Sequence, residues 1–173
     1  MTAQSAQSAQ SAQPARPADF DVLLAEVTAA AGRFGRREHV RLTWPAVRRF
    51  GAAEAVALVG DGIRRTATAA GAPQKYHETV TRAWVELVGH YAAEDGGADF
   101  AAFVDRCPDL LDKGLPARFY RPETPAGDRA KADWVEPDLA PFSRRRADRP
   151  TGVRGGDSGG RSVRIRLWGP AWP

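Results

Sequence analysis

The chain has 173 residues, of which 43% are hydrophobic, and this is enough to bury the core of one domain of common size. Its single cysteine, Cys107, excludes an intrachain disulfide and a zinc site built from several cysteines, and it is typical of a cytoplasmic protein. The formal net charge of +4 suggests nucleic-acid binding, but eight arginines against two aspartates after Phe142 account for all of it, so the preceding part is slightly acidic.

The first 17 residues contain the repeat "AQSAQSAQSAQ", which has neither the basic start nor the apolar stretch of a secretory signal. Such a composition cannot build a core, so we expect residues 1–17 to be disordered. No apolar run in the chain approaches the roughly 20 residues that span a membrane, and we therefore expect no membrane partner.

Between the ends, apolar residues recur at helical spacing in residues 18–142. This pattern predicts one all-α domain, a compact bundle of about five helices. The side chain of Asp19 is suited to cap the N-terminus of a first helix, which Gly32 can end. A second helix is expected at about 37–50, and Pro45 must either kink it or begin a new one because proline donates no backbone hydrogen bond.

A third helix is expected at about 52–70, ended by Gly71. Pro73 then lies near the first turn of a fourth helix, whose apolar stripe continues to Tyr91. Asp99 can cap a short fifth helix. The proline-rich segment that follows keeps several large apolar side chains, so we expect it to wrap over the bundle.

Residues 143–173 form a glycine- and arginine-rich tail. We expect this tail to be disordered, because few of its side chains are apolar. Its positive charge can attract RNA, DNA or an acidic partner without sequence specificity. Apart from that attraction, the sequence predicts no nucleic-acid binding.

Two short stretches each pair a histidine with a glutamate. In "RREHVRLTW" Glu38 precedes His39, and in "KYHETVTRAW" His77 precedes Glu78. At about 100° per residue, both histidines fall within an apolar helical stripe and each glutamate falls at its border. We therefore expect the four side chains to form a buried polar site, and we take them as the candidate catalytic residues.

Burying imidazole and carboxylate groups without partners costs free energy, so such a site must be hydrogen-bonded, metal-bound or hydrated. Three interpretations remain open. The first is a structural polar cluster that fixes the register of the helices. The second is a divalent metal site, for Fe or Zn, with His39, His77 and Glu78 as ligands. The third is metal-free acid-base catalysis by a histidine whose pKa is set by a neighbouring carboxylate.

Three segments follow one another along residues 20–142: "FGRREHVRLTW" from Phe34, "GAPQKYHET" from Gly71 and "CPDLLDKGLPARFY" from Cys107. They resemble the motifs H-x-[DE]-H, K-Y-H-E-T and P-D-L-L-D of a family of small bacterial proteins with no established activity. The resemblance therefore implies positions of interest, but it implies no reaction.

The residues that the resemblance marks are Glu38, His39, His77 and Glu78. Arg36 stands where the relatives have a histidine. If that histidine is a ligand in the family, the resemblance implies a lost ligand here and a non-catalytic member. Alternatively, Arg36 and Arg37 beside a polar pocket, together with the hydroxyl of Tyr76, would bind an anionic substrate.

Two functions follow from these residues. The first hypothesis is a small metal-dependent or acid-base enzyme that acts on a small-molecule substrate at the His/Glu site. The alternative is a non-catalytic helical interaction or accessory module, with a structural polar cluster and a tail that contacts a partner. A pocket beside converging His and Glu side chains favours the enzyme, whereas histidines sealed inside the fold favour the module.

Overall fold

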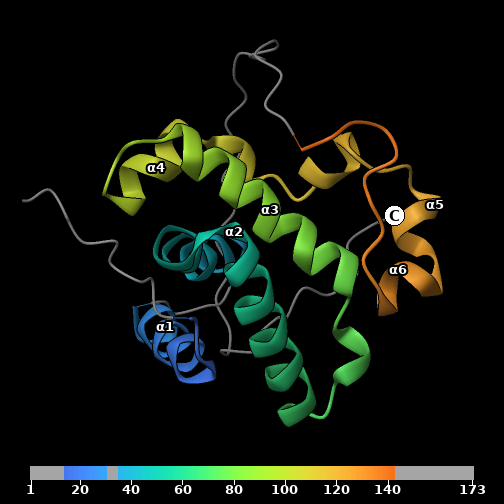
Figure 1. Ribbon diagram of the computed structural model, residues 1–173, viewed down its shortest axis with the longest axis horizontal. Coiled ribbons are helices and arrows are strands. Elements are labelled where there is room, and N and C mark those ends of the chain that lie inside the picture. The colour runs from blue at the N-terminus through green and yellow to red at the C-terminus, as the bar shows by residue number, and fades with distance from the viewer. Residues whose placement is uncertain (1–13, 31–34, 143–173) are drawn as a thin grey trace, which may run out of the picture.

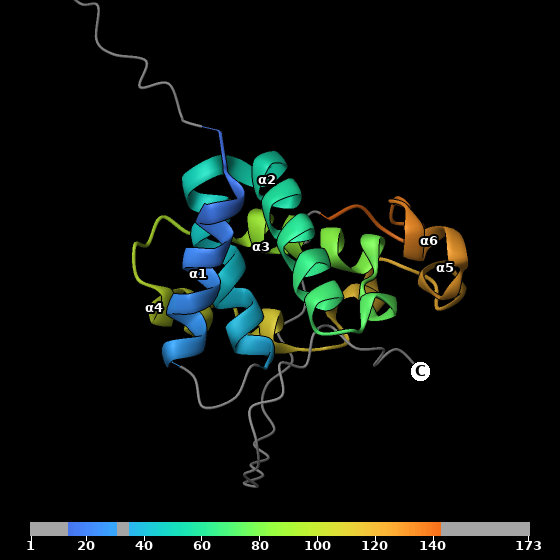
Figure 2. The same ribbon diagram turned by 90° about the horizontal axis from the view of Figure 1, so that it is seen from below.

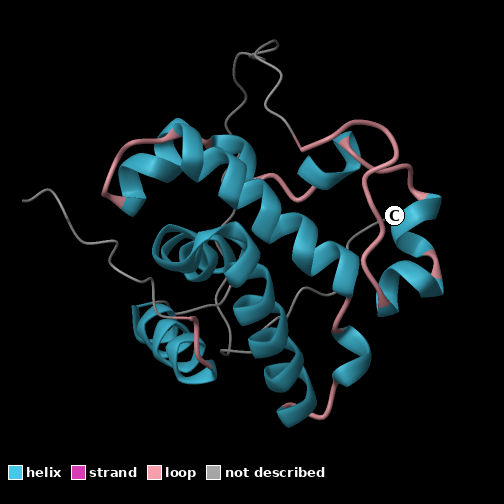
Figure 3. Cartoon of the chain, in the orientation of Figure 1, coloured by secondary structure: helices cyan, strands magenta, loops and turns pink. Residues whose placement is uncertain are grey.

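A computed structural model describes residues 14–30 and 35–142 (Figure 1). Within these residues the chain forms six α-helices, three short 3-10 helices and no strand (Figure 3), which confirms the predicted all-α fold. The α-helices are α1 (Pro17–Ala30), α2 (Arg36–Ala69), α3 (Glu78–Glu94), α4 (Phe100–Arg106), α5 (Glu123–Ala126) and α6 (Asp128–Ala132). The 3-10 helices are η1 (Pro73–Lys75), η2 (Pro108–Leu111) and η3 (Leu115–Arg118).

Both predicted tails fall largely outside the described residues, which begin at residue 14 and end at residue 142. Gly32, the predicted end of the first helix, also lies outside them. None of the helices in the described ranges combines the length and the apolar composition that crossing a membrane requires.

The first helix begins slightly earlier than predicted. α1 starts at Pro17, where the fixed φ of proline suits a first helical position. Asp19 is therefore not the N-cap but lies inside the first turn, and its Oδ2 accepts a hydrogen bond of 2.8 Å from the backbone N–H of Arg16. The carboxylate still caps the helix end, because it satisfies a backbone donor that lies before the first turn.

Helix α2 contains the break that separates the predicted second and third helices. Its one residue with non-helical backbone angles is Gly51, with φ of 81° and ψ of 166°. Residues with a side chain rarely adopt this conformation, so the sequence has glycine there. Pro45, by contrast, neither ends the helix nor starts a new one, and the two arms of α2 meet at Gly51 (Figure 1).

Helix α1 lies beside α2 (Figure 2), and one hydrophobic cluster joins the two helices. Its α1 side chains are Phe20, Leu23 and Val27, which lie at helical spacing on one buried face. The two helices approach closely at Gly62, because a Cβ atom added there would lie 2.3 Å from the Phe20 ring. Glycine at this position is therefore a packing requirement.

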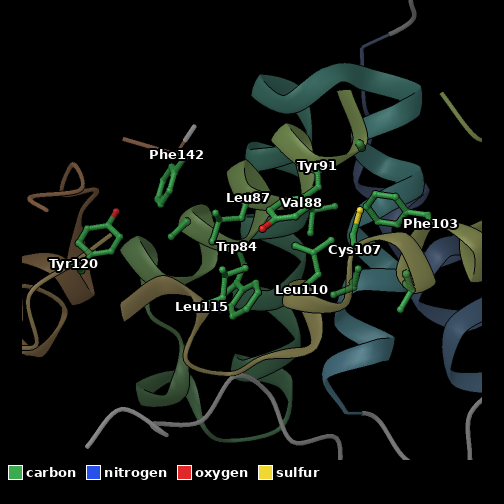
Figure 4. Close-up of a cluster of buried hydrophobic side chains, with 14 residues drawn as sticks. Trp84, Leu87, Val88, Tyr91, Phe103, Cys107, Leu110, Leu115, Tyr120 and Phe142 are labelled. Atoms are coloured by element: carbon green, nitrogen blue, oxygen red, sulfur yellow. The ribbon is translucent and has the colours of Figure 1, made fainter. Parts of the chain in front are cut away.

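A second hydrophobic cluster is centred on α3, which covers the first arm of α2 and carries the C-terminal segments on its other side (Figure 4). Trp84, Leu87 and Tyr91 of α3 contribute to it, together with Phe103 of α4. Phe142, at the end of the described chain, is buried against the same cluster. The expectation that the proline-rich segment wraps over the bundle is confirmed.

Candidate functional site

Two of the predicted site residues, Glu38 and His39, lie in the first turn of α2 and stabilise the N-terminus of that helix. The Glu38 carboxylate accepts a hydrogen bond of 2.8 Å from the backbone N–H of Gly35, which precedes the helix. His39 Nδ1 lies 2.7 Å from the carbonyl oxygen of the same Gly35. A carbonyl oxygen can only accept, so Nδ1 carries the proton. Both side chains therefore fix the residue where α2 begins.

His39 is sealed inside the fold, since only 6% of its surface is exposed. Burial lowers the pKa of its imidazole to about 4, the hydrogen bond to Gly35 opposes this shift, and the charge of Arg36 adds to it. The ring is therefore neutral near pH 7. A buried, neutral imidazole is suited to a structural role in an apolar interior.

The spacing predicted that His77 lies on the buried face of a helix, and this prediction is wrong. The segment after Pro73 is the short η1, and His77 is the N-cap of α3. Its Nδ1 accepts a hydrogen bond of 3.3 Å from the backbone N–H of Val80, and its Nε2 lies 2.8 Å from the carbonyl oxygen of Pro125. Only the tautomer with the proton on Nε2 makes both contacts, so both ring nitrogens have partners within the protein.

Glu78 points toward the second arm of α2. One carboxylate oxygen accepts a hydrogen bond of 2.6 Å from the Tyr76 hydroxyl and one of 2.7 Å from the Arg64 guanidinium. Burial and the neighbouring Glu78 carboxylate raise the pKa of the Tyr76 phenol, which stays protonated and donates. Tyr76, predicted to bind substrate, is thus part of a hydrogen-bonded junction between α2 and α3.

Thr79, which was not among the residues predicted from the sequence, completes this junction. Its hydroxyl donates to the carbonyl oxygen of Asp133 at 2.7 Å and accepts from the backbone N–H of Val135 at 3.0 Å. We call residues 76–79, "YHET", the YHET junction. In the sequence, the junction could have been recognised by Thr79, which directly follows the His-Glu pair in "KYHET".

Arg36 and Arg37, predicted to bind substrate together, lie against different aromatic rings. The Arg36 guanidinium is 4.0 Å from the centre of the Trp84 ring, while that of Arg37 is 5.6 Å from the centre of Phe100. Burial lowers the pKa of Arg36 to about 10, which the Asp112 carboxylate opposes, so its guanidinium stays charged near pH 7. Guanidinium groups over aromatic faces are favourable contacts of about 0.5–2 kcal/mol.

The described residues contain no group of three or more His, Cys, Asp or Glu side chains that could hold a metal ion. His39, His77 and Glu78 are therefore not brought together as a ligand set in residues 14–30 and 35–142. Each of the three instead has the hydrogen-bond partners described above.

A shallow cavity of about 80 Å³ lies between the start of α1 and the second arm of α2. Its lining residues are Ala15, Pro17, Glu54, Ala57, Leu58, Asp61 and Arg65. The predicted catalytic residues are not among them. Its volume is also well below the roughly 300–1,000 Å³ that is usual for small-molecule sites.

Comparison of the chain with family models, with curated proteins and with solved structures finds no match. The resemblance of the three segments to a bacterial family therefore stays a prediction.

Proposed function

We propose that this protein is a non-catalytic helical interaction module, in which the His/Glu residues stabilise the fold. The observation that carries this proposal is the position of His77. Its two ring nitrogens contact the first turn of α3 and the carbonyl oxygen of Pro125 in α5, so neither nitrogen is available for a metal or a substrate. The other three predicted catalytic side chains also have structural partners.

The experiment separates the two contacts of His77 by substitution. His77→Asn keeps an oxygen that can accept from the Val80 N–H, because asparagine is a favoured N-cap, but it is too short to reach Pro125. His77→Ala removes both contacts. We expect the free energy of unfolding to fall by about 1 kcal/mol in the Asn variant. In the Ala variant it should fall by about 2–3 kcal/mol, since the cap is lost as well.

His90→Gln is the matched control, because His90 lies on the same helix and is exposed. Its free energy of unfolding should equal that of the parent within about 0.5 kcal/mol. Metal content is measured in parallel on parent protein purified without a His tag, and no stoichiometric Fe or Zn is expected. Stoichiometric metal in the parent that disappears in His77→Asn, with little change in stability, would refute the module and favour the enzyme.

A further inference from the structure

Three arginines lie in a row on the outer side of the first arm of α2. At about 100° per residue, Arg37, Arg41 and Arg48 fall within an arc of about 40°, and Trp44 lies next to them. All three arginines are exposed. They extend over about 16 Å of helix at 1.5 Å per residue. We call them the arginine face.

Two aromatic rings support the arginine face. The guanidinium carbons of Arg37 and Arg41 lie 5.6 and 5.7 Å from the centre of the Phe100 ring, and that of Arg48 lies 5.0 Å from Trp44. The rings of Trp44 and Phe100 contact each other edge to face, with centres 5.8 Å apart. Restrained arginines lose less side-chain entropy when they bind an anion, so the face is pre-organised for binding.

No carboxylate in the described part of the chain forms an ion pair with an arginine of this face. Arg48 donates to the carbonyl oxygen of Gly97, which is neutral. Exposed arginines elsewhere do pair with carboxylates, and examples are Arg64, Arg65, Arg106 and Arg118. The arginines of the face therefore form no direct ion pair in the described part of the chain, and the carboxylate charge that acts on Arg48 is that of Asp95, which is itself paired with Arg106.

We propose that the arginine face binds an acidic segment of a partner protein, a helix with carboxylates spaced to meet the three guanidinium groups. Planar guanidinium groups bind carboxylates in a bidentate geometry, which gives register as well as attraction. This inference rests on the proposed function, and it names the class of partner.

The surroundings of the face favour an acidic peptide over a nucleic acid. Acidic side chains outnumber basic ones among the described residues, and Asp95 and Asp99 lie on the loop that also carries Gly97. A nucleic acid strand has charge along its whole length and would meet these carboxylates. A short helix places its carboxylates only opposite the arginines.

The test is a titration of the full-length protein with fluorescein-labelled 16-residue peptides at low salt, read by anisotropy. One peptide has three glutamates at i, i+4 and i+11 in an Ala/Gln background, and the other has the same composition with the glutamates on different sides of the helix. The parent should bind the first peptide about ten-fold more tightly, as expected from three exposed charge pairs. The arginine-rich tail attracts both peptides equally, so the ratio of the two affinities reports the face.

The face variant R37Q/R41Q/R48Q should lose this preference. The matched control R121Q/R129Q/K131Q removes three other exposed positive charges and should keep it. Glutamine is a good helix former, so both variants are expected to fold. If circular dichroism shows that the face variant is unfolded, the single variant Arg41→Gln carries the test, with a two- to three-fold loss of preference.

The proposal is overturned if the parent shows no preference, or if the face and control variants bind alike. It is also overturned if a 16-nucleotide oligo-dT binds the parent more tightly than either peptide and loses that binding in the face variant, since the face would then be a nucleic-acid surface. These outcomes are independent of the His77 variants and of the metal content, so failure of this inference is distinguishable from failure of the proposed function.

Discussion

Replacing His39 by asparagine is expected to change how the stability of the protein depends on pH. The imidazole has an ordinary pKa of 6.5 when exposed, and burial lowers the pKa to about 4 in the folded protein. Between these values the unfolded chain binds a proton that the folded chain excludes. The contribution of the neutral, buried His39 to the free energy of unfolding is therefore fully present above pH 6.5 and is lost as the pH falls toward 4.

The size of this effect follows from the difference between the two pKa values. Each unit corresponds to 1.36 kcal/mol, so the buried histidine accounts for a loss of about 3 kcal/mol across the whole range, and about 2 kcal/mol of it by pH 5. His39→Asn removes the titration but keeps a donor, because the asparagine amide occupies nearly the same place as Nδ1–H and can still donate to the carbonyl oxygen of Gly35.

The assay is urea denaturation of the parent and of His39→Asn at pH 7.5, 6.0 and 5.0, followed by far-UV circular dichroism. The two proteins differ only at residue 39, so the difference between the two curves isolates the contribution of His39. We expect the parent to lose about 2 kcal/mol more than the variant between pH 7.5 and pH 5.0. Parallel curves would show that the ring of His39 accepts a proton in the folded state, and the burial argument would be wrong.

Three further substitutions test the packing and the junction by equilibrium denaturation. Gly62→Ala is expected to cost about 1–3 kcal/mol because its Cβ would overlap the Phe20 ring, and combining it with Phe20→Leu should restore part of that loss. Gly51→Ala should cost about 1–3 kcal/mol through backbone strain alone, since nothing lies within 4 Å of the added Cβ, and a neutral result would contradict the positive φ. Thr79→Val should cost about 1–3 kcal/mol by leaving two backbone groups without partners, whereas Thr43→Val, whose hydroxyl bonds only within its own helix, should cost less.

Local patterns predicted the helices well because their causes are local. The apolar stripes of α1, α2 and α3 lie where their spacing placed them, and the break at Gly51 separates two helices as expected. The predicted position of His77 was wrong because the helical spacing was counted from Pro73. The 3-10 helix η1 ends at Lys75, and the next α-helix begins only at Glu78. Histidine is an uncommon N-cap, and the acidic Glu78 in the first turn was the one sign of a helix start directly after it.

Glu38 and His39 contact Gly35 in their own helix start, but His77 and Glu78 also contact residues far away in sequence, and these distant contacts could not be predicted. The Nε2 of His77 contacts a carbonyl oxygen 48 residues later, and Glu78 contacts Arg64 in the preceding helix. No spacing rule links such residues, because the contacts depend on how α5 and α2 pack against α3. The two His-Glu pairs resembled each other in composition, but each meets a different part of the fold.

The YHET junction has a consequence for the order in which the protein folds. Its contacts to Pro125, Asp133 and Val135 join residues 48 to 56 positions apart, and closing such loops is entropically costly before the core has formed. Segment 123–135 should therefore dock late, on a subdomain of α1, α2 and α3 that is already packed. In native-state hydrogen exchange, the amide of Val135 should open at a lower free energy than the amides in the middle of α3, and it should lose protection together with the rest of that segment.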